Sequence, residues 1–433
     1  AAWRREDIDE AIALLTHGAE AAAAAGDADT RIVALLLLAP ALVRAEHLEE
    51  AQARLLALAP VFPPETIPTE QALGRYLAED VHAARTQPPA DLSAMDGYAL
   101  CGDGPWQKVG ESRAGAPFEA ALRPGQCVRI STGAHVPEGA DRVLLQEDAA
   151  VSGGQVSTTE VLPRGRHIRP RGFDFAAGVR VLQQGTAMTA ARIALAIAAG
   201  RPALAAARAV RVAILDTGDE LAADPLACAV HQIPASNGAM LSAMLTPLGC
   251  EVIRLGPVGD DHAKLAQALT QAEGADILIT SGGASVGDHD LVQAALGRWG
   301  AEIAFWKVAI KPGKPMMVAT RANQLVIGLP GNPVSCFVTA FLFALPVVRA
   351  SMGAREALPL RYRLVTGEDL PPVGPRREFL RAVNDGGIAR LVGSQDSSAL
   401  MALAEANCLI DRTAGSPALP KGSDVWGYLL HIG

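Results

Sequence analysis

Residues Ser281 to Asp290 form a loop of glycine, hydroxyl and carboxylate residues between two elements of regular structure. Before the loop lies the apolar, β-branched stretch 275–280, which predicts a buried strand. After it, Leu291 to Trp299 has helical spacing, and Asp290 stands where a helix cap belongs. Glycines let backbone N–H groups converge, and the helix dipole favours negative charge at a helix N-terminus. This stretch therefore predicts a binding site for a phosphate or another anion.

Two further loops of the same character follow along the chain. The first places Lys311 and Lys314 around a Pro-Gly turn. The second runs from Gly328 to Ser335, where Asn332 can cap a helix that begins at Pro333. One such loop is weak support for an anion site, but three within one α/β pattern are strong support. The predicted anion-binding residues are Ser281, Gly282, Gly283, Ser285, Gly287, Lys311, Lys314, Pro330, Gly331, Asn332, Pro333 and Ser335.

Three carboxylates, Glu220, Asp260 and Asp290, fall beside these loops. Because Mg²⁺ prefers a few carboxylates together with phosphate oxygens, we expect a magnesium ion here, with Glu220 and Asp290 as its ligands. Plainer roles remain open at this point. Asp290 can be a helix cap alone, Asp260 can simply open the next helix, and the lysine turn can be a solvated surface turn.

Apolar strand-like segments alternate with helical segments between Arg211 and Gly353. The expected strands are 210–215, 251–255, 277–280, 303–308 and 325–327, and the expected helices are 239–248, 262–273, 291–299 and 334–350. This alternation predicts a doubly wound parallel sheet. Ligands of such sheets bind at the carboxyl ends of the strands, where the anion loops and the three carboxylates fall.

The rest of the chain divides into helical and β-rich parts. Helical spacing predicts two helices in residues 1–45, and further helices at 45–59, 70–76 and 187–199. Short β-like pieces punctuated by Gly and Pro lie between the last two. We therefore expect an N-terminal helical extension of unknown role at 1–45, a helical domain at 46–81 plus 177–208, an inserted β-rich domain at 82–176, an α/β domain at 209–353 and a C-terminal β barrel or sandwich at 354–433.

The composition is that of a folded protein with a large core. Half of the 433 residues are hydrophobic, 19% are charged, and the formal net charge is −8 without an extended Lys/Arg tract, which argues against nucleic acid as a partner. The six cysteines contain no CxxC pair, as expected for reduced thiols in a cytoplasm, and the nine histidines lack zinc-ligand spacing. The apolar run 333–348 follows a strand and contains Pro346, so we expect a buried helix and no membrane span.

Six motifs occur in the order typical of one known family. They are Ser93-Ala94-Met95-Asp96-Gly97-Tyr98-Ala99, Arg129-Ile130-Ser131-Thr132-Gly133-Ala134, Thr217-Gly218-Asp219-Glu220-Leu221, the Ser281-Gly282-Gly283 loop, the Lys311 to Pro315 turn and the Gly328 to Ser335 loop. On these motifs, residues 46 to 433 resemble the molybdopterin molybdenumtransferases, the family of MoeA and the gephyrin E domain. Residues 1–45 fall outside the family pattern.

The resemblance implies an activity, cofactors and partners. Members of this family insert molybdate into adenylylated molybdopterin, release AMP and yield molybdenum cofactor, with Mg²⁺. The resemblance also implies a four-part subunit with a helical linker domain, an inserted β domain, an α/β domain that binds molybdopterin and a C-terminal β-barrel-like domain. Family members are elongated homodimers in which the inserted domain of one subunit faces the α/β domain of the other. The resemblance also implies contacts with molybdopterin adenylyltransferase and with maturation proteins of molybdoenzymes.

The family's site residues carry over to six positions of this sequence. The inserted-domain side of the site would be Asp96, Thr132 and Asp174, and the α/β side would be Glu220, Asp260 and Asp290. Two positions depart from the family pattern: Ala284 replaces the usual valine, and Phe173 replaces the acidic residue usual before Asp174.

Two other functions are compatible with part of this pattern. The molybdopterin adenylyltransferases share the Ser-Gly-Gly and Pro-Gly-Asn-Pro loops in a single domain, but the motif at 93–99 and the terminal β domain argue against them. A non-catalytic scaffold of the same fold is the other alternative, and the presence of all the acidic positions argues against it.

Overall fold

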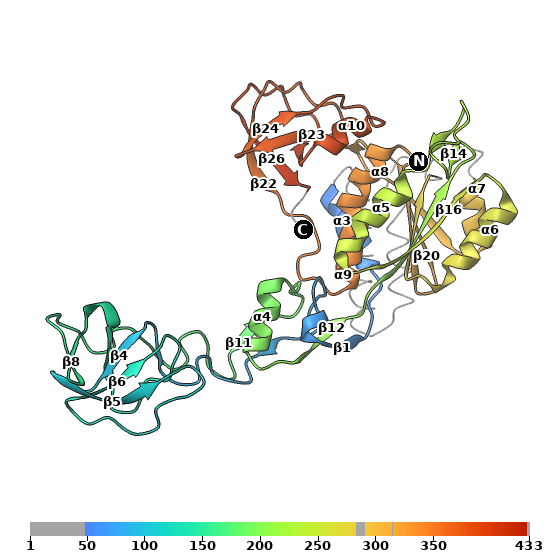
Figure 1. Ribbon diagram of the computed structural model, residues 1–433. Coiled ribbons are helices and arrows are strands. Elements are labelled where there is room, and N and C mark those ends of the chain that lie inside the picture. The colour runs from blue at the N-terminus through green and yellow to red at the C-terminus, as the bar shows by residue number, and fades with distance from the viewer. Residues whose placement is uncertain (1–47, 283–290, 314, 431–433) are drawn as a thin grey trace, which may run out of the picture. The chain divides into compact units, whose positions relative to one another are not determined.

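The computed structural model describes residues 48–282, 291–313 and 315–430, which form two compact units (Figure 1). The smaller unit comprises Thr66–Leu73 and Glu79–Ala205, and the larger unit contains the rest of the described chain. The motifs at 93–99 and 129–134 fall in the smaller unit, and the four later motifs fall in the larger one. The helices expected in residues 1–45 lie outside the described residues.

The smaller unit is built around a six-stranded sheet. In spatial order its strands are β7 (Arg142–Leu145), β4 (Gly97–Leu100), β6 (Gln126–Ile130), β5 (Trp106–Ser112), β9 (Gln155–Ser157) and β8 (Ala150–Ser152). Successive side chains of a strand point to opposite faces, so Tyr98 and Leu100 enter one apolar core while Ala99 and Cys101 enter another. The β-rich character expected for this part of the chain is confirmed.

The region expected to be a helical linker is only partly helical. It contains α3 (Leu48–Ala57), β1 (Pro64–Pro68), β2 (Val81–His82), β11 (Arg180–Leu182), α4 (Ala190–Ala198) and β12 (Ala203–Ala207). The helix expected at 70–76 is instead a single 3₁₀ turn, η1 (Thr69–Gln71). The 3₁₀ turn ends at Gln71, and the chain turns at Gly74, whose left-handed φ of 76° does not fit a helix that continues to residue 76.

The larger unit contains a six-stranded mixed sheet. In spatial order its strands are β16 (Glu251–Val258), β13 (Arg211–Thr217), β17 (Ile277–Ser281), β21 (Gln324–Leu329), β20 (Pro315–Arg321) and β18 (Glu302–Lys307). The first four are parallel, whereas β20 runs antiparallel to both of its neighbours. Strand β20 was not expected from the sequence. Only residues 322 and 323 connect it to β21, and so short a connection can join only antiparallel strands.

Helices cover both faces of this sheet, as a doubly wound fold requires. Figure 1 shows α6 (His262–Gln271) and α7 (Leu291–Arg298) on one face and α5 (Asn237–Leu245) and α8 (Pro333–Thr339) on the other. After α8 the helix continues through a π-helical turn, η5 (Ala340–Ala344), into α9 (Leu345–Ser351). This helix is long and apolar enough to cross a membrane, but 83% of its apolar window is buried inside the protein. The expectation of a core helix is therefore confirmed.

The C-terminal part of the larger unit is a closed barrel. Its ring of strands is β23 (Arg377–Asp385), β24 (Ile388–Leu391), β22 (Tyr362–Thr366), β26 (Asp424–Leu429) and β25 (Cys408–Arg412), and pairing of β25 with β23 closes it. The short strand β19 (Ile310–Lys311) pairs with β23 from outside the ring. Its pairing places Lys311 opposite Glu378, so a residue from one of the predicted anion loops is attached to the barrel.

An ion-pair cluster at Asp276 holds the start of the central strands. Its carboxylate accepts hydrogen bonds from Arg208 Nη1 at 2.7 Å, from Arg208 Nη2 at 2.8 Å and from the backbone N–H of Arg211 at 2.8 Å. Burial alone would raise the pKa of Asp276, but the Arg208 guanidinium and the Arg211 N–H outweigh burial, and the pKa lies below its usual value.

We predict that Asp276→Asn lowers the free energy of unfolding by about 2 kcal/mol at pH 7, because it leaves a half-buried guanidinium without its counter-charge. A carboxylate with a lowered pKa stabilises the fold above its unfolded-state pKa and loses this contribution as the pH falls through its folded-state pKa. The difference from the native chain should therefore shrink below about pH 4. Urea unfolding of both proteins at several pH values measures this difference in the free energy of unfolding.

Asp424→Asn is the matched control, since it breaks an exposed pair with Arg363 at 2.7 Å. Exposed pairs contribute little, so the control should cost less than about 0.5 kcal/mol. An equal loss in the two variants, or a loss in Asp276→Asn that does not change with pH, would contradict the role given to Asp276.

Candidate functional site

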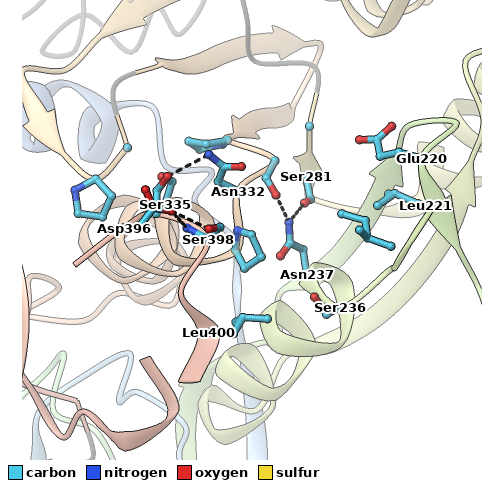
Figure 2. Close-up of a pocket in the computed structure, with 18 of the residues that line it drawn as sticks. Glu220, Leu221, Ser236, Asn237, Ser281, Asn332, Ser335, Asp396, Ser398 and Leu400 are labelled. Carbon is cyan, nitrogen blue, oxygen red and sulfur yellow. Dashed lines mark hydrogen bonds between the residues drawn. The ribbon is translucent and has the colours of Figure 1, made fainter. Parts of the chain in front are cut away.

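Three parallel strands of the larger unit end at the same level. Asp216 in β13 pairs with Ser281 in β17, and Ser281 pairs with Leu329 in β21. The loops that follow these strands therefore leave the sheet at one edge, which is where ligands of α/β sheets bind. A cavity of about 1070 Å³ opens at this edge (Figure 2).

The cavity brings together many of the predicted site residues. Those that line it are Glu220, Ser281, Gly282, Lys311, Pro330, Gly331, Asn332, Pro333 and Ser335. The predicted residues Gly283, Ser285, Gly287, Asp290 and Lys314 lie outside the described residues, so their roles stay predictions. Ser281 and Gly282, the described part of the first anion loop, thus meet the third loop and the described part of the second at one site.

The loop after β13 places Glu220 at the cavity. Gly218 in this loop has a φ of 141°, a backbone conformation that other residues rarely adopt, so the curl of the loop favours glycine. The loop after β16 is joined to it, since the N–H of Asp260 donates to Asp219 Oδ1 at 2.9 Å. The carboxylate of Asp260 is exposed and is not among the residues that line this cavity.

The cap of α6 is Asp261, whose carboxylate accepts from the N–H of Lys264 at 2.9 Å. Asp261, and not Asp260, therefore has the role of opening the helix. The loop that contains Asp260 lies at the same edge of the sheet as Glu220. The role of the Asp260 side chain in the site stays a prediction.

The floor of the cavity holds polar groups that the sequence did not single out. Asn237, the first residue of α5, donates from Nδ2 to Ser281 Oγ at 2.7 Å and to the carbonyl oxygen of Gly331 at 2.6 Å. Behind it, Asp216 is 3% exposed and accepts from the N–H of Gly238 at 3.1 Å. An acidic residue at the end of an apolar strand was the signal that could have identified Asp216.

Burial raises the pKa of Asp216, because an ionised carboxylate loses hydration in the interior. The N–H of Gly238, the charge of Arg254 and the hydroxyl of Ser281 offset only part of this increase. Burial likewise raises the pKa of the nearby Cys336 thiol, to about 12, so this cysteine is an inert core residue and not a nucleophile.

The barrel supplies another wall of the cavity, through Arg376, Gln395, Asp396, Ser397, Ser398 and Leu400. Figure 2 shows Glu220 on one side of the cavity and Asp396 with Ser398 on the other. Asp396 accepts from the N–H and the hydroxyl of Ser398 at 2.9 and 2.6 Å, and these bonds lower its pKa. No motif pointed to these barrel residues, because they reach the site only through tertiary packing.

Asn332 links the third anion loop to the barrel. It occupies the cap position before Pro333, as predicted, but its side chain makes no capping hydrogen bond. Its Nδ2 donates to Ser397 Oγ at 3.0 Å instead, and the N–H of Val334 donates to the Ser397 carbonyl oxygen at 3.2 Å. The Ser397 carbonyl oxygen therefore accepts from an N–H of the first helical turn, a group that a local cap would otherwise satisfy.

Lys311 lies at the cavity in an ion pair that was not expected. Its Nζ is 3.0 Å from Glu378 Oε1, and the lysine side chain remains 51% exposed. An ammonium group has three donors, so one carboxylate partner leaves it able to contact an anion as well. Glu378 holds the lysine in place but also reduces the local positive charge.

In the smaller unit, the structure brings two predicted residues into direct contact. Asp96 Oδ1 accepts from the N–H of Thr132 at 2.7 Å. The short strands β3 (Leu92–Ser93) and β10 (Ile168–Arg169) pair beside them, so the arginine-rich stretch 164–171 packs against the first motif. Asp174 follows on the same unit, exposed, with its N–H donated to the Gln87 carbonyl oxygen at 3.1 Å.

A magnesium ion was expected at this site. Within the described ranges, no group of three or more His, Cys, Asp or Glu side chains is arranged to hold a metal ion. Glu220 nevertheless fits a magnesium site of the type that uses one or two carboxylates together with substrate phosphate oxygens. Its carboxylate lies at the cavity beside the anion loops.

Comparison with known proteins gives a consistent result along the chain. Family models match three successive regions: the MoeA N-terminal region (domain I and II) at residues 46–200, a probable molybdopterin binding domain at 213–350 and the MoeA C-terminal region (domain IV) at 363–430. The molybdopterin molybdenumtransferase of Haemophilus influenzae is 35% identical over 378 residues, which are 84% of this chain and 93% of that protein.

Two further relatives match most of this chain as well. Molybdopterin molybdenumtransferase 2 of Mycobacterium tuberculosis is 37% identical over 369 residues, covering 80% of this chain and 90% of that protein. The crystal structure of a molybdopterin biosynthesis moeA protein from Pyrococcus horikoshii OT3 matches with a TM-score of 0.75 and 26% identity, over 88% of this chain and 99% of that one. These matches confirm the resemblance that the motifs indicated: the chain belongs to the molybdopterin molybdenumtransferase (MoeA) family.

Proposed function

We propose that this chain inserts molybdenum from molybdate into adenylylated molybdopterin and releases AMP. The observation that carries the proposal is the cavity where the loops after β17 and β21 meet Lys311 and Arg376. The substrate has a pyrophosphate bridge and molybdate is a dianion, so the site must hold several negative charges. In a chain with a net charge of −8, local donors of this kind have to supply that binding.

The chemistry that this site can support is positioning with charge stabilisation. Cleavage of a phosphoanhydride requires alignment of the reacting groups and compensation of the developing charge, and no covalent nucleophile. Ser281, Ser335 and Lys311 offer hydroxyl and ammonium donors at the cavity. The N–H groups of Gly282 and Val334 are already bound to Leu329 and Ser397, so they shape the loops.

We also propose Mg²⁺ as the cofactor, with Glu220 as a ligand and Asp290 as a second ligand. A divalent cation bound there would supply compensation for the charge of the phosphate oxygens. The position of Glu220 at the cavity supports this assignment. Asp290 is the last residue of the anion loop that begins at Ser281.

The assembly we propose is a cytoplasmic homodimer with shared active sites. Asp96, Thr132 and Asp174 would complete the site of one subunit from the smaller unit of the other. Free cysteines support a reducing compartment. The adenylyltransferase that makes the substrate and the maturation proteins that take the product are the expected protein partners. The terminal barrel and the inserted sheet argue against the single-domain adenylyltransferase as the function of this chain.

We predict that Glu220→Gln lowers Mg²⁺-dependent AMP release at least about a hundredfold, because it removes the charge that compensates the cation while preserving the size of the side chain. AMP is measured with adenylylated molybdopterin, molybdate and a Mg²⁺ titration. Glu405→Gln, an exposed position in α10 (Leu400–Glu405) away from the cavity, is the control and should retain native activity. Near-native turnover by Glu220→Gln at saturating Mg²⁺ would rule out the metal-ligand role.

Formation of adenylylated molybdopterin by the native chain from molybdopterin and ATP would instead favour the adenylyltransferase function.

Mixing experiments test the shared site. Asp96→Ala and Glu220→Ala should each be inactive, but re-equilibrated mixtures should recover about one quarter of native activity, since half of the dimers are mixed and each mixed dimer has one intact site. Native mass spectrometry confirms that mixed dimers form. If they form and the mixture stays as inactive as its parents, the two sets of residues do not meet across subunits.

A further inference from the structure

The side-chain amide of Asn237 lies between two of the loops at the cavity (Figure 2). A primary amide has two N–H hydrogens, and both are used here, one by Ser281 Oγ at 2.7 Å and one by the Gly331 carbonyl oxygen at 2.6 Å. Ser281 is the last residue of β17, and Gly331 lies just after the adjacent strand β21. One side chain on a third element therefore ties the end of β17 to the loop after β21.

The orientation of this amide is determined by Gly331. A carbonyl oxygen only accepts hydrogen bonds, so the flipped amide would bring two oxygens together and is excluded. Ser281 Oγ therefore receives a hydrogen from Asn237, and its own hydrogen must point to a different acceptor. The carboxylate of Asp216, whose pKa the Ser281 hydroxyl lowers, is one such acceptor, and an anion in the cavity is another. Asn237 thus leaves Ser281 free to act as a donor.

Asn237 is itself held in place by the end of β13. The next residue, Gly238, is buried and donates its N–H to Asp216 Oδ2 at 3.1 Å. A Cβ on Gly238 would lie 2.2 Å from that oxygen, so only glycine lets α5 approach the strand this closely. Asp216 is also in register with Ser281. One connected set of hydrogen bonds therefore runs from β13 through α5 to both loops.

We propose that Asn237 is a positioning residue, which holds Ser281 at the end of β17 and Gly331 after β21 at the spacing and with the hydroxyl orientation that the anionic substrate requires. The inference rests on the proposed function, because it assigns to Asn237 the geometry of the loops that would bind that substrate. It acts through Ser281 and Gly331 and adds no group to the chemistry. Its loss should therefore weaken binding more than turnover.

Asn237→Asp is the most direct test, since it preserves the shape of the side chain but turns an oxygen toward Gly331. We expect the KM for adenylylated molybdopterin, and its Kd measured by calorimetry without molybdate, to rise at least about tenfold, with kcat changed less than about threefold. A double-mutant cycle of Asn237→Ala with Ser281→Ala measures how strongly the two side chains depend on each other in substrate binding. The effect of Asn237→Ala on Kd should be smaller when Ser281→Ala has already removed the hydroxyl.

Asn407→Asp is the matched control. Asn407 makes a comparable amide tie in the barrel, with Nδ2 donating to the Asn384 carbonyl oxygen at 3.0 Å and Oδ1 accepting from the Asn384 N–H at 2.6 Å. It should lower the Tm and leave the Kd unchanged. If Asn237→Asp binds as tightly as the native chain, or if the cycle is additive, Asn237 does not act through these loops.

Hydrogen exchange separates this inference from the proposed function. Faster exchange of segments 278–282 and 328–332 in Asn237→Asp, but not in Asn407→Asp, supports the positioning role whatever the substrate is. Equal exchange in the two variants overturns it. A native chain that neither binds adenylylated molybdopterin nor releases AMP would overturn the proposed function instead.

Discussion

The parallel register of β13, β17 and β21 is the constraint on which the site depends. The hydrogen bonds between these strands align Asp216, Ser281 and Leu329 side by side, so the loops after them must begin at one edge of the sheet. The strands are buried on both faces, and a slip of one residue would turn every side chain to the wrong face. The same register that stabilises the core therefore determines which backbone and side-chain groups surround the cavity.

The barrel completes the site by two attachments to the α/β part. Strand β19 places Lys311 beside β23, where it forms an ion pair with Glu378. The side-chain amide of Asn332 donates a hydrogen bond to the Ser397 hydroxyl. Both contacts satisfy a polar group of an anion loop with a partner from the barrel. The protein has a net charge of −8, so the anion binding that we propose relies on converging local donors.

The predicted chemistry divides between the two compact units. In the smaller unit, the contact of Asp96 with the N–H of Thr132 comes from loops that the antiparallel strands β4 and β6 hold together. In the larger unit, the cavity contains donors for anions and the carboxylate of Glu220. Neither unit alone carries all the predicted groups.

The sequence by itself determined the features that depend on near neighbours in the chain. Glycines with hydroxyls after a β-branched run predicted the loop at Ser281 and the α/β order around it, because backbone freedom and apolar periodicity are local properties. The helix expected at 70–76 was wrong, since the structure has only a 3₁₀ turn that ends at Gln71, and the left-handed φ of Gly74 does not fit a helix that continues to residue 76. Only the tertiary structure decided the roles of Asn237, Asp216 and Ser397 and the partner of Lys311. Their hydrogen bonds and burial depend on which distant residues become neighbours, and local pattern does not carry that information.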